Sequence, residues 1–245
     1  MKNSTSLFAA VKGFAAQLFL VLFAFFSTLN VWGQISVTIT GITNTTPNLD
    51  ASYTSFANFV TALNGVTAVS GSVTATLAAG SSETAPIKGF NISTSTANVF
   101  TTTNTLTIVK ASGSATTINA GVGTAASPGA SSDGMLYLSG MDGVTIDGLT
   151  FTDGNTATAT VAMEFGIALF KKAAGDGCNG NTIQNCTFNM QRISNGNASG
   201  PMTDGSCALQ VLNSTPSAAT TSLTPTNGGT LATNGTNSNN KFYSN

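Results

Sequence analysis

The stretch Met135–Phe151, MLYLSGMDGVTIDGLTF, decides the fold of this chain. Leu136 and Leu138 are spaced two residues apart, which predicts a strand with one buried face. The residues between and beside them are expected to point outward: Met135, Tyr137 and Ser139. Gly140–Gly143 has the composition of a turn, so the strand should end there.

A second short strand follows this turn. Val144 and Ile146 alternate with polar residues, and after Gly148 the apolar positions move one step out of phase, to Leu149 and Phe151. Glycine adopts positive φ without a Cβ clash, so a glycine at such a shift indicates a bend or a bulge.

The second strand recurs twice later in the chain. A shift of 37 residues aligns TIDGLTF (145–151) with TIQNCTF (182–188), and a further 59 residues reach NKFYSN (240–245). The alignment predicts a ladder of core side chains at Ile146, Ile183 and Phe242, with Phe151 next to Phe188. Gly148 aligns with Asn185 as the bend, because asparagine tolerates the left-handed region better than other non-glycine residues.

The first strand recurs in the same way. Leu136-x-Leu138 is followed by Ile167-x-Leu169 and then by Leu209-x-Val211. The repeating unit is therefore strand, turn, strand and bend, joined by segments of variable length. One such unit cannot bury its apolar face alone, so successive units are expected to stack as coils around a shared core.

These repeats resemble those of right-handed parallel β-helix proteins of the pectate-lyase-like superfamily. The resemblance covers roughly residues 69–245 and rests on the V-T-I-x-G-L-T-F and N-T-I-x-N-C-T-F rows. It implies an all-β chain, a right-handed parallel β-helix or β-solenoid. The alternative from strand spacing alone is an antiparallel β-sandwich.

Residues 1–33 are predicted to be a signal peptide. Lys2 and Lys12 flank the apolar run Phe14–Phe26, which is shorter than the roughly 20 residues that span a bilayer. Val31-Trp32-Gly33 suits cleavage before Gln34, although an uncleaved anchor is the alternative. After cleavage we expect no stable membrane span, and a secreted, extracellular or outer-cell-surface location.

Residues 34–68 are predicted to form an N-terminal strand and a capping helix. The strand is expected within Gln34–Thr43. In the helix, four apolar residues are spaced i, i+3, i+4 and i+7, with Ser55 suited to cap the start and Gly65 the end: Phe56, Phe59, Val60 and Leu63. Such a helix would shield the open end of a β-solenoid core.

Residues 69–245 are assigned to the coils. One or two early coils are expected from four short strands, at 73–77, 87–92, 106–109 and 117–120. The Thr-, Ser-, Asn- and Gly-rich segment 214–238 is interpreted as a surface loop or a partly disordered insert. The sequence ends within a repeat, so we expect these residues to be the N-terminal part of a longer protein.

Charge and composition limit the classes of molecule that the surface of this protein can attract. The chain has 8 basic and 9 acidic residues and no histidine, and only 7% of its residues are charged. Such a surface gives no electrostatic attraction to nucleic acid or anionic lipid.

The three cysteines are Cys178, Cys186 and Cys207. Cys186 aligns with Leu149 and is expected to be buried, while a Cys178–Cys207 disulfide is the open alternative.

The superfamily resemblance makes a polysaccharide lyase or a glycoside hydrolase one hypothesis. Glycoside hydrolysis needs paired carboxyl groups, and lyases of this shape use calcium and a basic residue. The acids considered are Asp142, Asp147, Asp153, Glu164, Asp176 and Asp204. Asp142 and Asp176 precede glycines and are better interpreted as turn residues. Asp147 aligns with Gln184 and Tyr243, so no carboxylate ladder forms there.

The preferred hypothesis is an exported structural or adhesive surface protein that binds extracellular or cell-surface polysaccharide. Catalytic residues stay unknown, with Asp147, Asp153 and Glu164 as candidates. No cofactor or metal is expected, and calcium only under the lyase alternative. An ice-binding face made of Thr74, Thr76, Thr105 and Thr107 is set aside because the threonines lack regular repetition across coils.

Overall fold

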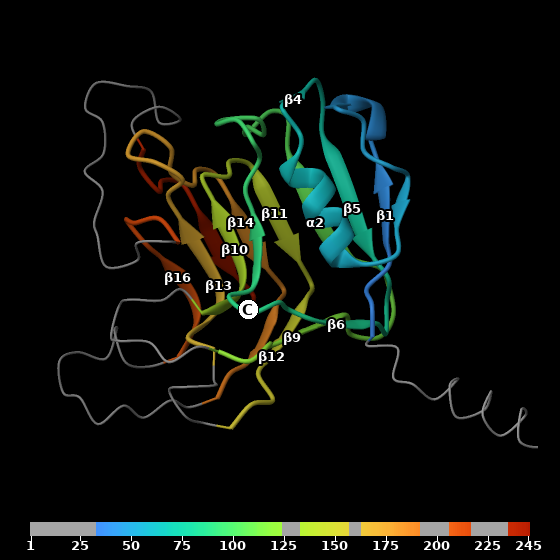
Figure 1. Cartoon of the computed structure of the whole chain (residues 1–245), viewed down its shortest axis with the longest axis vertical. Coiled ribbons are helices and arrows are strands. Elements are labelled where there is room, and N and C mark those ends of the chain that lie inside the picture. Colours follow the sequence, from blue (N-terminus) through green and yellow to red (C-terminus); the bar gives the residue numbers. More distant parts are fainter. Residues whose placement is uncertain (1–32, 124–132, 157–162, 192–205, 217–234) are drawn as a thin grey trace, which may run out of the picture. The chain divides into compact units, whose positions relative to one another are not determined.

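The strands of the computed structural model assemble into three sheets whose repeating strands run parallel and a small antiparallel sheet (Figure 1). The structure describes residues 33–123, 133–156, 163–191, 206–216 and 235–245. Contacts group Gln34–Asn245 as one unit. The predicted signal peptide up to residue 32, most of the 214–238 segment and Asp204 lie outside the described residues.

The sheets are named here A to D. Sheet A contains β1 (Val37–Thr40), β3 (Ser52–Tyr53), β5 (Val73–Leu77), β8 (Leu106–Lys110), β11 (Val144–Asp147), β14 (Thr182–Gln184) and β17 (Lys241–Tyr243). Sheet B pairs β2 (Thr45–Thr46) with β4 (Ala68–Val69). Sheet C contains β6 (Ser82–Thr84), β9 (Thr117–Asn119), β12 (Thr150–Thr152) and β15 (Thr187–Asn189). Sheet D contains β7 (Phe90–Ile92), β10 (Gly134–Ser139), β13 (Phe165–Phe170) and β16 (Cys207–Val211).

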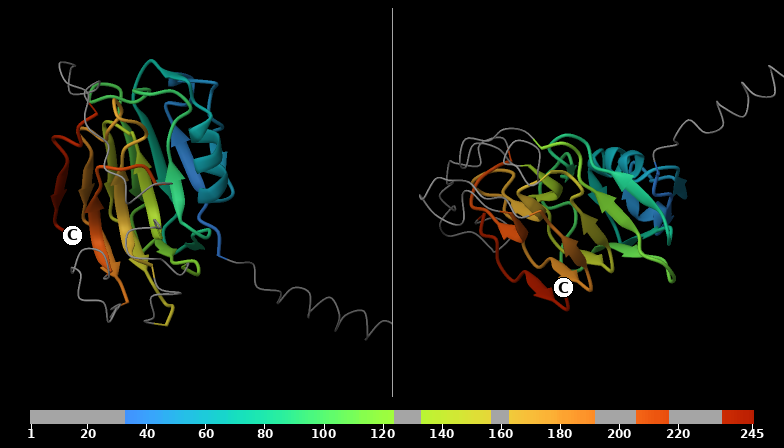
Figure 2. Two further views of the ribbon diagram at one scale, coloured as in Figure 1. Left: turned by 60° about the vertical axis from the view of Figure 1, so that its left-hand side comes forward. Right: turned by 90° about the horizontal axis from the view of Figure 1, so that it is seen from below.

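From β5 onward the chain visits sheets A, C and D in a fixed cycle. The described strands make four such rounds and β17 begins the next, so that each strand pairs with its counterpart one round away. All of these pairings are parallel. In Figure 2 the colours accordingly step from strand to neighbouring strand along the sequence. The protein is therefore mainly β, with parallel sheets stacked in register as in a β-solenoid, and the antiparallel β-sandwich alternative is wrong.

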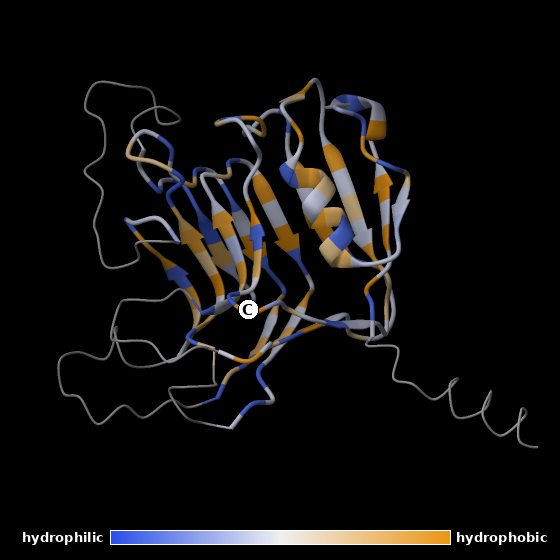
Figure 3. Ribbon diagram, viewed as in Figure 1, coloured by the Kyte–Doolittle hydropathy of each residue, from blue (hydrophilic) through white to orange (hydrophobic). Residues whose placement is uncertain are grey.

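The register of the sheets is that of the sequence repeat. Ile146 pairs with Ile183, which pairs in turn with Phe242. The two isoleucines are fully buried, but Phe242 is 39% exposed, so its predicted place in the core is wrong. Phe151 pairs with Phe188, and their rings stack at 5.1 Å between centroids. The bends after the sheet A strands use left-handed backbone, with φ of 76° at Gly148 and 55° at Asn185. Figure 3 shows the resulting alternation of apolar and polar residues along the strands.

Sheet D differs from the expectation of one buried face. All six residues of β10 and all six of β13 are buried. The outer face carries its own small apolar cluster of Tyr137, Phe165, Ala168 and Phe170, against which Cys207 and Leu212 pack. The Tyr137 and Phe170 rings meet edge to face at 5.5 Å. The outward residues of β10 are therefore not solvent-exposed.

The N-terminal residues close one end of the coil stack. β1 pairs antiparallel with β5 and with β3, so that sheet A ends in antiparallel strands. A short 3-10 helix, η1 (Ile42–Asn44), follows β1. The predicted helix is present as α2 (Phe56–Asn64), and the Ser55 hydroxyl accepts a hydrogen bond from the Asn58 N–H at 3.1 Å. The Asn64 side chain bonds the backbone of β7 and of the residue after it, at Asn91 O and Ser93 N, both at 2.8 Å.

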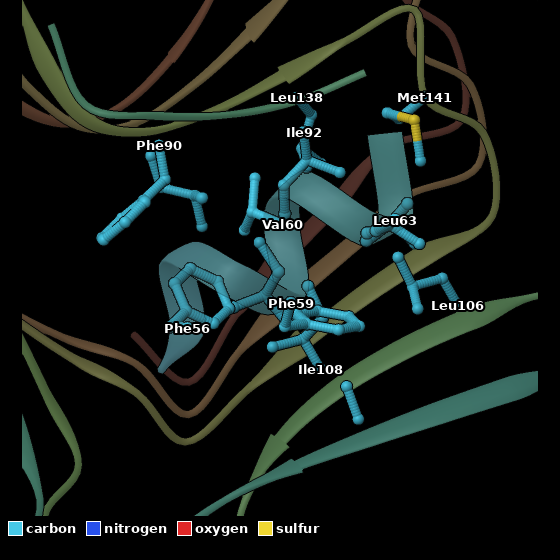
Figure 4. Packing of buried hydrophobic residues seen from close by; sticks show 14 of the residues in the cluster. Phe56, Phe59, Val60, Leu63, Phe90, Ile92, Leu106, Ile108, Leu138 and Met141 are labelled. Carbon is cyan, nitrogen blue, oxygen red and sulfur yellow. The ribbon is translucent and has the colours of Figure 1, made fainter. Parts of the chain in front are cut away.

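The apolar face of α2 enters the shared core. Figure 4 shows its side chains among residues of sheets A and D, and the four expected positions are all buried: Phe56, Phe59, Val60 and Leu63. The Phe56 ring meets Phe90 of β7 edge to face at 5.0 Å. The helix thereby covers apolar surface that the first strand of sheet D would otherwise expose.

Two details of the early coils differ from the prediction. The strand expected at 87–92 comprises only Phe90–Ile92, and Ile87 is 65% exposed. A strand that the sequence pattern missed, β6, places Glu83 inward next to Ile118 of β9. Glu83 is only 7% exposed, because its carboxylate lies under the start of α2.

Candidate functional site

The outer face of sheet A carries a continuous threonine column. One residue from each of five neighbouring strands contributes: Thr40, Thr74, Thr107, Thr145 and Thr182. Strands in a sheet lie about 4.8 Å apart, so the hydroxyl groups repeat at about that interval. Thr40 is exposed and the other four are partly exposed. The expectation that the threonines lack regular repetition across coils is wrong for Thr74 and Thr107, which share this column. Thr105 does not belong to it, because it precedes β8 and donates its hydroxyl to Ser72 Oγ.

The neighbouring column on sheet A contains one charged residue, Asp147. It lies between Val109 and Gln184 in the register. Both of its carboxylate oxygens accept hydrogen bonds, from Gln184 Nε2 at 2.8 Å and from Asn185 Nδ2 at 2.7 Å. The ammonium group of Lys110 on the same sheet donates to the backbone of its own turn, to Ala111 O and Gly113 O. Asp147 and Lys110 are therefore held by neighbouring polar groups, while the exposed Lys241 of β17 lies next to Thr182 in the register.

The outer face of sheet C carries no charged residue in its two columns. Its two columns are Ser82, Thr117, Thr150 and Thr187, and Thr84, Asn119, Thr152 and Asn189. No aspartate or glutamate occurs in either column, so the described part of sheet C offers hydroxyl and amide groups only.

Three acids gather at the segment that joins sheets C and D. Asp133 and Asp153 are buried, and Glu164 is partly buried. Met163 N donates to Asp153 Oδ2 at 2.8 Å, and Glu164 N donates to Asp133 O at 2.8 Å. Burial, together with the charges of Asp133 and Asp153, raises the pKa of Glu164 to about 8. Two of the nominated catalytic acids, Asp153 and Glu164, are thus electrostatic neighbours, while Asp147 lies apart from them on sheet A.

A polar network runs through the turns from sheet D to sheet A. Asn179 N donates to Asp142 Oδ1 at 2.7 Å, and Ser238 N donates to Asn179 Oδ1 at 3.1 Å. The side chains of Asp142 and Asn179 thus each accept a hydrogen bond from the backbone of the following coil. Burial raises the pKa of Asp142 to about 6, against the lowering effect of the Asn179 hydrogen bonds. Burial likewise raises the pKa of Asp176 to about 6, against the attraction of Lys172.

Asparagine side chains bracket the backbone of the preceding coil at three places. Asn181 accepts from Val144 N and donates to Met141 O, both at 2.8 Å. Asn240 repeats this arrangement one coil later, with Asn181 N and Cys178 O. Asn245 does the same with Cys186 N and Ile183 O. In each case the side chain joins the N–H of one residue to the carbonyl of the third residue before it, which satisfies buried backbone groups at the turns.

Replacing Asn181 by alanine is expected to lower the free energy of unfolding by about 2–3 kcal/mol, because a buried N–H and a buried carbonyl lose their partners. Asn181 is fully buried. Urea denaturation measures the change. The matched control is Asn189→Ala, since Asn189 is exposed and makes a long bond of 3.4 Å to Thr152 Oγ1. Equal losses in the two variants would contradict the bracketing role.

The three thiols are free in this structure, so the Cys178–Cys207 disulfide alternative is not realised. Cys178 and Cys186 are buried. The Cys178 thiol lies 3.2 Å from Phe170 O and 3.3 Å from Leu138 O. Burial raises the pKa of Cys178 to about 12 and that of Cys186 to about 11, which disfavours the reactive thiolate.

The described residues hold no group of three or more histidine, cysteine, aspartate or glutamate side chains that could bind a metal ion. Within the same residues, no helix has the length and apolar character required to cross a bilayer. Protein-family models, curated proteins and solved structures were compared with the chain, and none of them matches it.

Proposed function

We propose that the coils form a right-handed parallel β-helix and that the protein is exported, to act outside the cell or at its surface as a structural or adhesive module. Right-handedness is supported by the parallel crossovers between like strands, since nearly all such connections in proteins are right-handed. Export is supported by the sequence of residues 1–33, with its basic flank and short apolar run.

The ligand class we propose is neutral polysaccharide, bound along the threonine column of sheet A. The observation that carries this proposal is the in-register run of five hydroxyl groups beside a carboxylate whose oxygens are already hydrogen-bonded. A repeating row of weak hydrogen-bonding groups suits a repeating polymer, because many small contacts add up to avidity. The low charge of the chain fits an uncharged partner.

The test uses purified protein on insoluble neutral polysaccharides and on cell-wall preparations. We expect a triple variant of the sheet A column, Thr107→Val, Thr145→Val and Thr182→Val, to bind at least roughly tenfold more weakly, since each lost hydrogen bond is worth about 0.5–1.5 kcal/mol. Valine keeps the β-branched shape that a strand favours. The matched control is the sheet C triple, Thr117→Val, Thr150→Val and Thr187→Val. Binding that is unaffected by the sheet A triple, or reduced equally by both, would overturn the assignment to sheet A.

The second candidate is a polysaccharide hydrolase or lyase, and one observation favours it. With a pKa of about 8, Glu164 is protonated at neutral pH beside two other carboxyl groups, which is the pairing that a general acid in glycoside hydrolysis requires. Against it, Asp133 and Asp153 are almost completely buried, away from a polymer in solution.

Incubation with pectins, alginates and neutral glycans tests the enzymatic candidate. The enzymatic candidate predicts new reducing ends or unsaturated products with the wild-type protein. The rate of product formation should fall roughly 100-fold or more in the Glu164→Gln variant, as expected for removal of a general acid. The binding proposal predicts no product from either protein. Product formed equally by both proteins would exclude Glu164 as the acid.

A further inference from the structure

The folded unit begins at Gln34, the residue that follows the predicted cleavage site. Ile35 is fully buried, and its N–H donates to Glu83 Oε2 at 2.9 Å. Gln34 itself is exposed, as is Gly33 before it. The fold therefore anchors the chain from Ile35 onward and leaves the side chain of Gln34 at the surface.

We propose that Gln34 becomes the first residue of the mature protein and cyclises to pyroglutamate. This inference rests on the proposed export, which supplies the cleavage after Gly33. The α-amino nitrogen of Gln34 attacks Cδ of its own side chain. A bond forms between that nitrogen and Cδ, the nitrogen gives up a proton to Nε2, the bond from Cδ to Nε2 breaks, and Nε2 leaves as ammonia. No oxidant, reductant or second substrate is needed.

The surroundings of Gln34 are compatible with this step. An α-amino group has a pKa of about 7.7–8.0, so a substantial fraction is the unprotonated nucleophile at neutral pH. The nearby Glu83 carboxylate already accepts hydrogen bonds from the N–H groups of Ile35, Phe56 and Ala57 at 2.8–3.0 Å. These bonds occupy three of its roughly four acceptor sites, which limits its ability to hold the amine as an ammonium.

Cyclisation leaves the fold unchanged. The reaction consumes the α-amine but keeps the peptide bond between Gln34 and Ile35, so the Ile35 N–H can still donate to Glu83. The consequence is a mature chain whose first residue has no free amine and whose second residue is buried. Aminopeptidases need a free amine, so this terminus should resist them.

The experiment expresses the full chain with its own leader in a Gram-negative host and measures the intact mass of the processed protein and of its terminal peptide. We expect a chain that starts at Gln34, lacks the mass of one ammonia in its terminal peptide and does not react with an amine-specific reagent at its N-terminus. The control, Gln34→Ala, should be cleaved at the same bond, keep its full mass, take up the reagent and lose its first residue to an aminopeptidase.

Two outcomes would overturn the proposal, and they are distinguishable. A chain that begins at Gln34 but keeps its amine after prolonged incubation at neutral pH refutes cyclisation and leaves export intact. A chain that begins at Met1, or at any residue other than Gln34, refutes the cleavage site; retention of Met1 also removes the support for export.

Discussion

Replacing Glu83 by alanine is expected to lower the free energy of unfolding by about 3–5 kcal/mol, since two buried N–H groups and a partly buried one lose a charged acceptor at once. The carboxylate accepts from Ile35 N, Phe56 N and Ala57 N at 2.8–3.0 Å. Two of these donors belong to the first turn of α2, where a negative charge also complements the helix dipole. A domain has only about 5–15 kcal/mol of stability in total, so this variant should be visibly destabilised.

Urea denaturation monitored by circular dichroism measures the effect of Glu83→Ala. Glu83→Gln should lose less of the free energy of unfolding than Glu83→Ala. It keeps one acceptor oxygen, although its amide N–H groups then face one of the backbone N–H donors. The control is Asp50→Ala, which removes an exposed carboxylate and should change stability by less than about 0.5 kcal/mol. If Glu83→Ala matched Asp50→Ala, the carboxylate would not be what fixes α2 to the first coil.

Acidification from pH 8 to pH 4 is expected to stabilise the protein through two buried carboxyl groups and a partly buried one. Asp142 and Asp176 have pKa values raised from 3.8 to about 6, and Glu164 has one raised from 4.5 to about 8, chiefly by burial. A raised pKa means that the folded state holds the proton more tightly than the unfolded state. The stabilisation is thus full below about pH 4 and is lost as pH rises through 6 and then 8.

The contribution of these groups over that range should be at least about 3 kcal/mol, because one pKa unit corresponds to about 1.4 kcal/mol. Thermal unfolding at a series of pH values measures it. Glu164→Gln should flatten the profile between about pH 5 and 8, and Asp142→Asn should flatten it between about pH 4 and 6 while keeping the acceptor for Asn179 N. A profile unchanged by either substitution would show that the buried carboxyl groups do not drive the pH dependence.

The sequence predicted those parts of the fold that depend on local patterns. The 37-residue shift aligned Ile146 with Ile183, and the sheets pair these residues. The helix at 56–64 was predictable because its apolar spacing and its cap at Ser55 are both written within ten residues. The helix is recognised from one short stretch, and the repeat from a direct comparison of two short stretches.

The parts that could not be predicted depend on neighbours far away in the sequence. Glu83 is 48 residues from Ile35 and 27 from Phe56, and no pattern in the short strand around it marks an inward carboxylate. The outer face of sheet D was expected to face solvent, but an apolar cluster covers it. The asparagine brackets could have been predicted from the sequence, because the repeat aligns Asn181 with Asn240.

The asparagine brackets also imply an order of assembly. Each of these side chains completes the backbone hydrogen bonds of the coil before it, so a coil finds its partner groups only when its predecessor is already in place. The antiparallel strands and α2, which belong to the first-synthesised end, make their contacts within the first round. We therefore expect the chain to fold from its N-terminus towards its C-terminus. The N-terminal residues form a template, and each later coil then pairs with the coil before it.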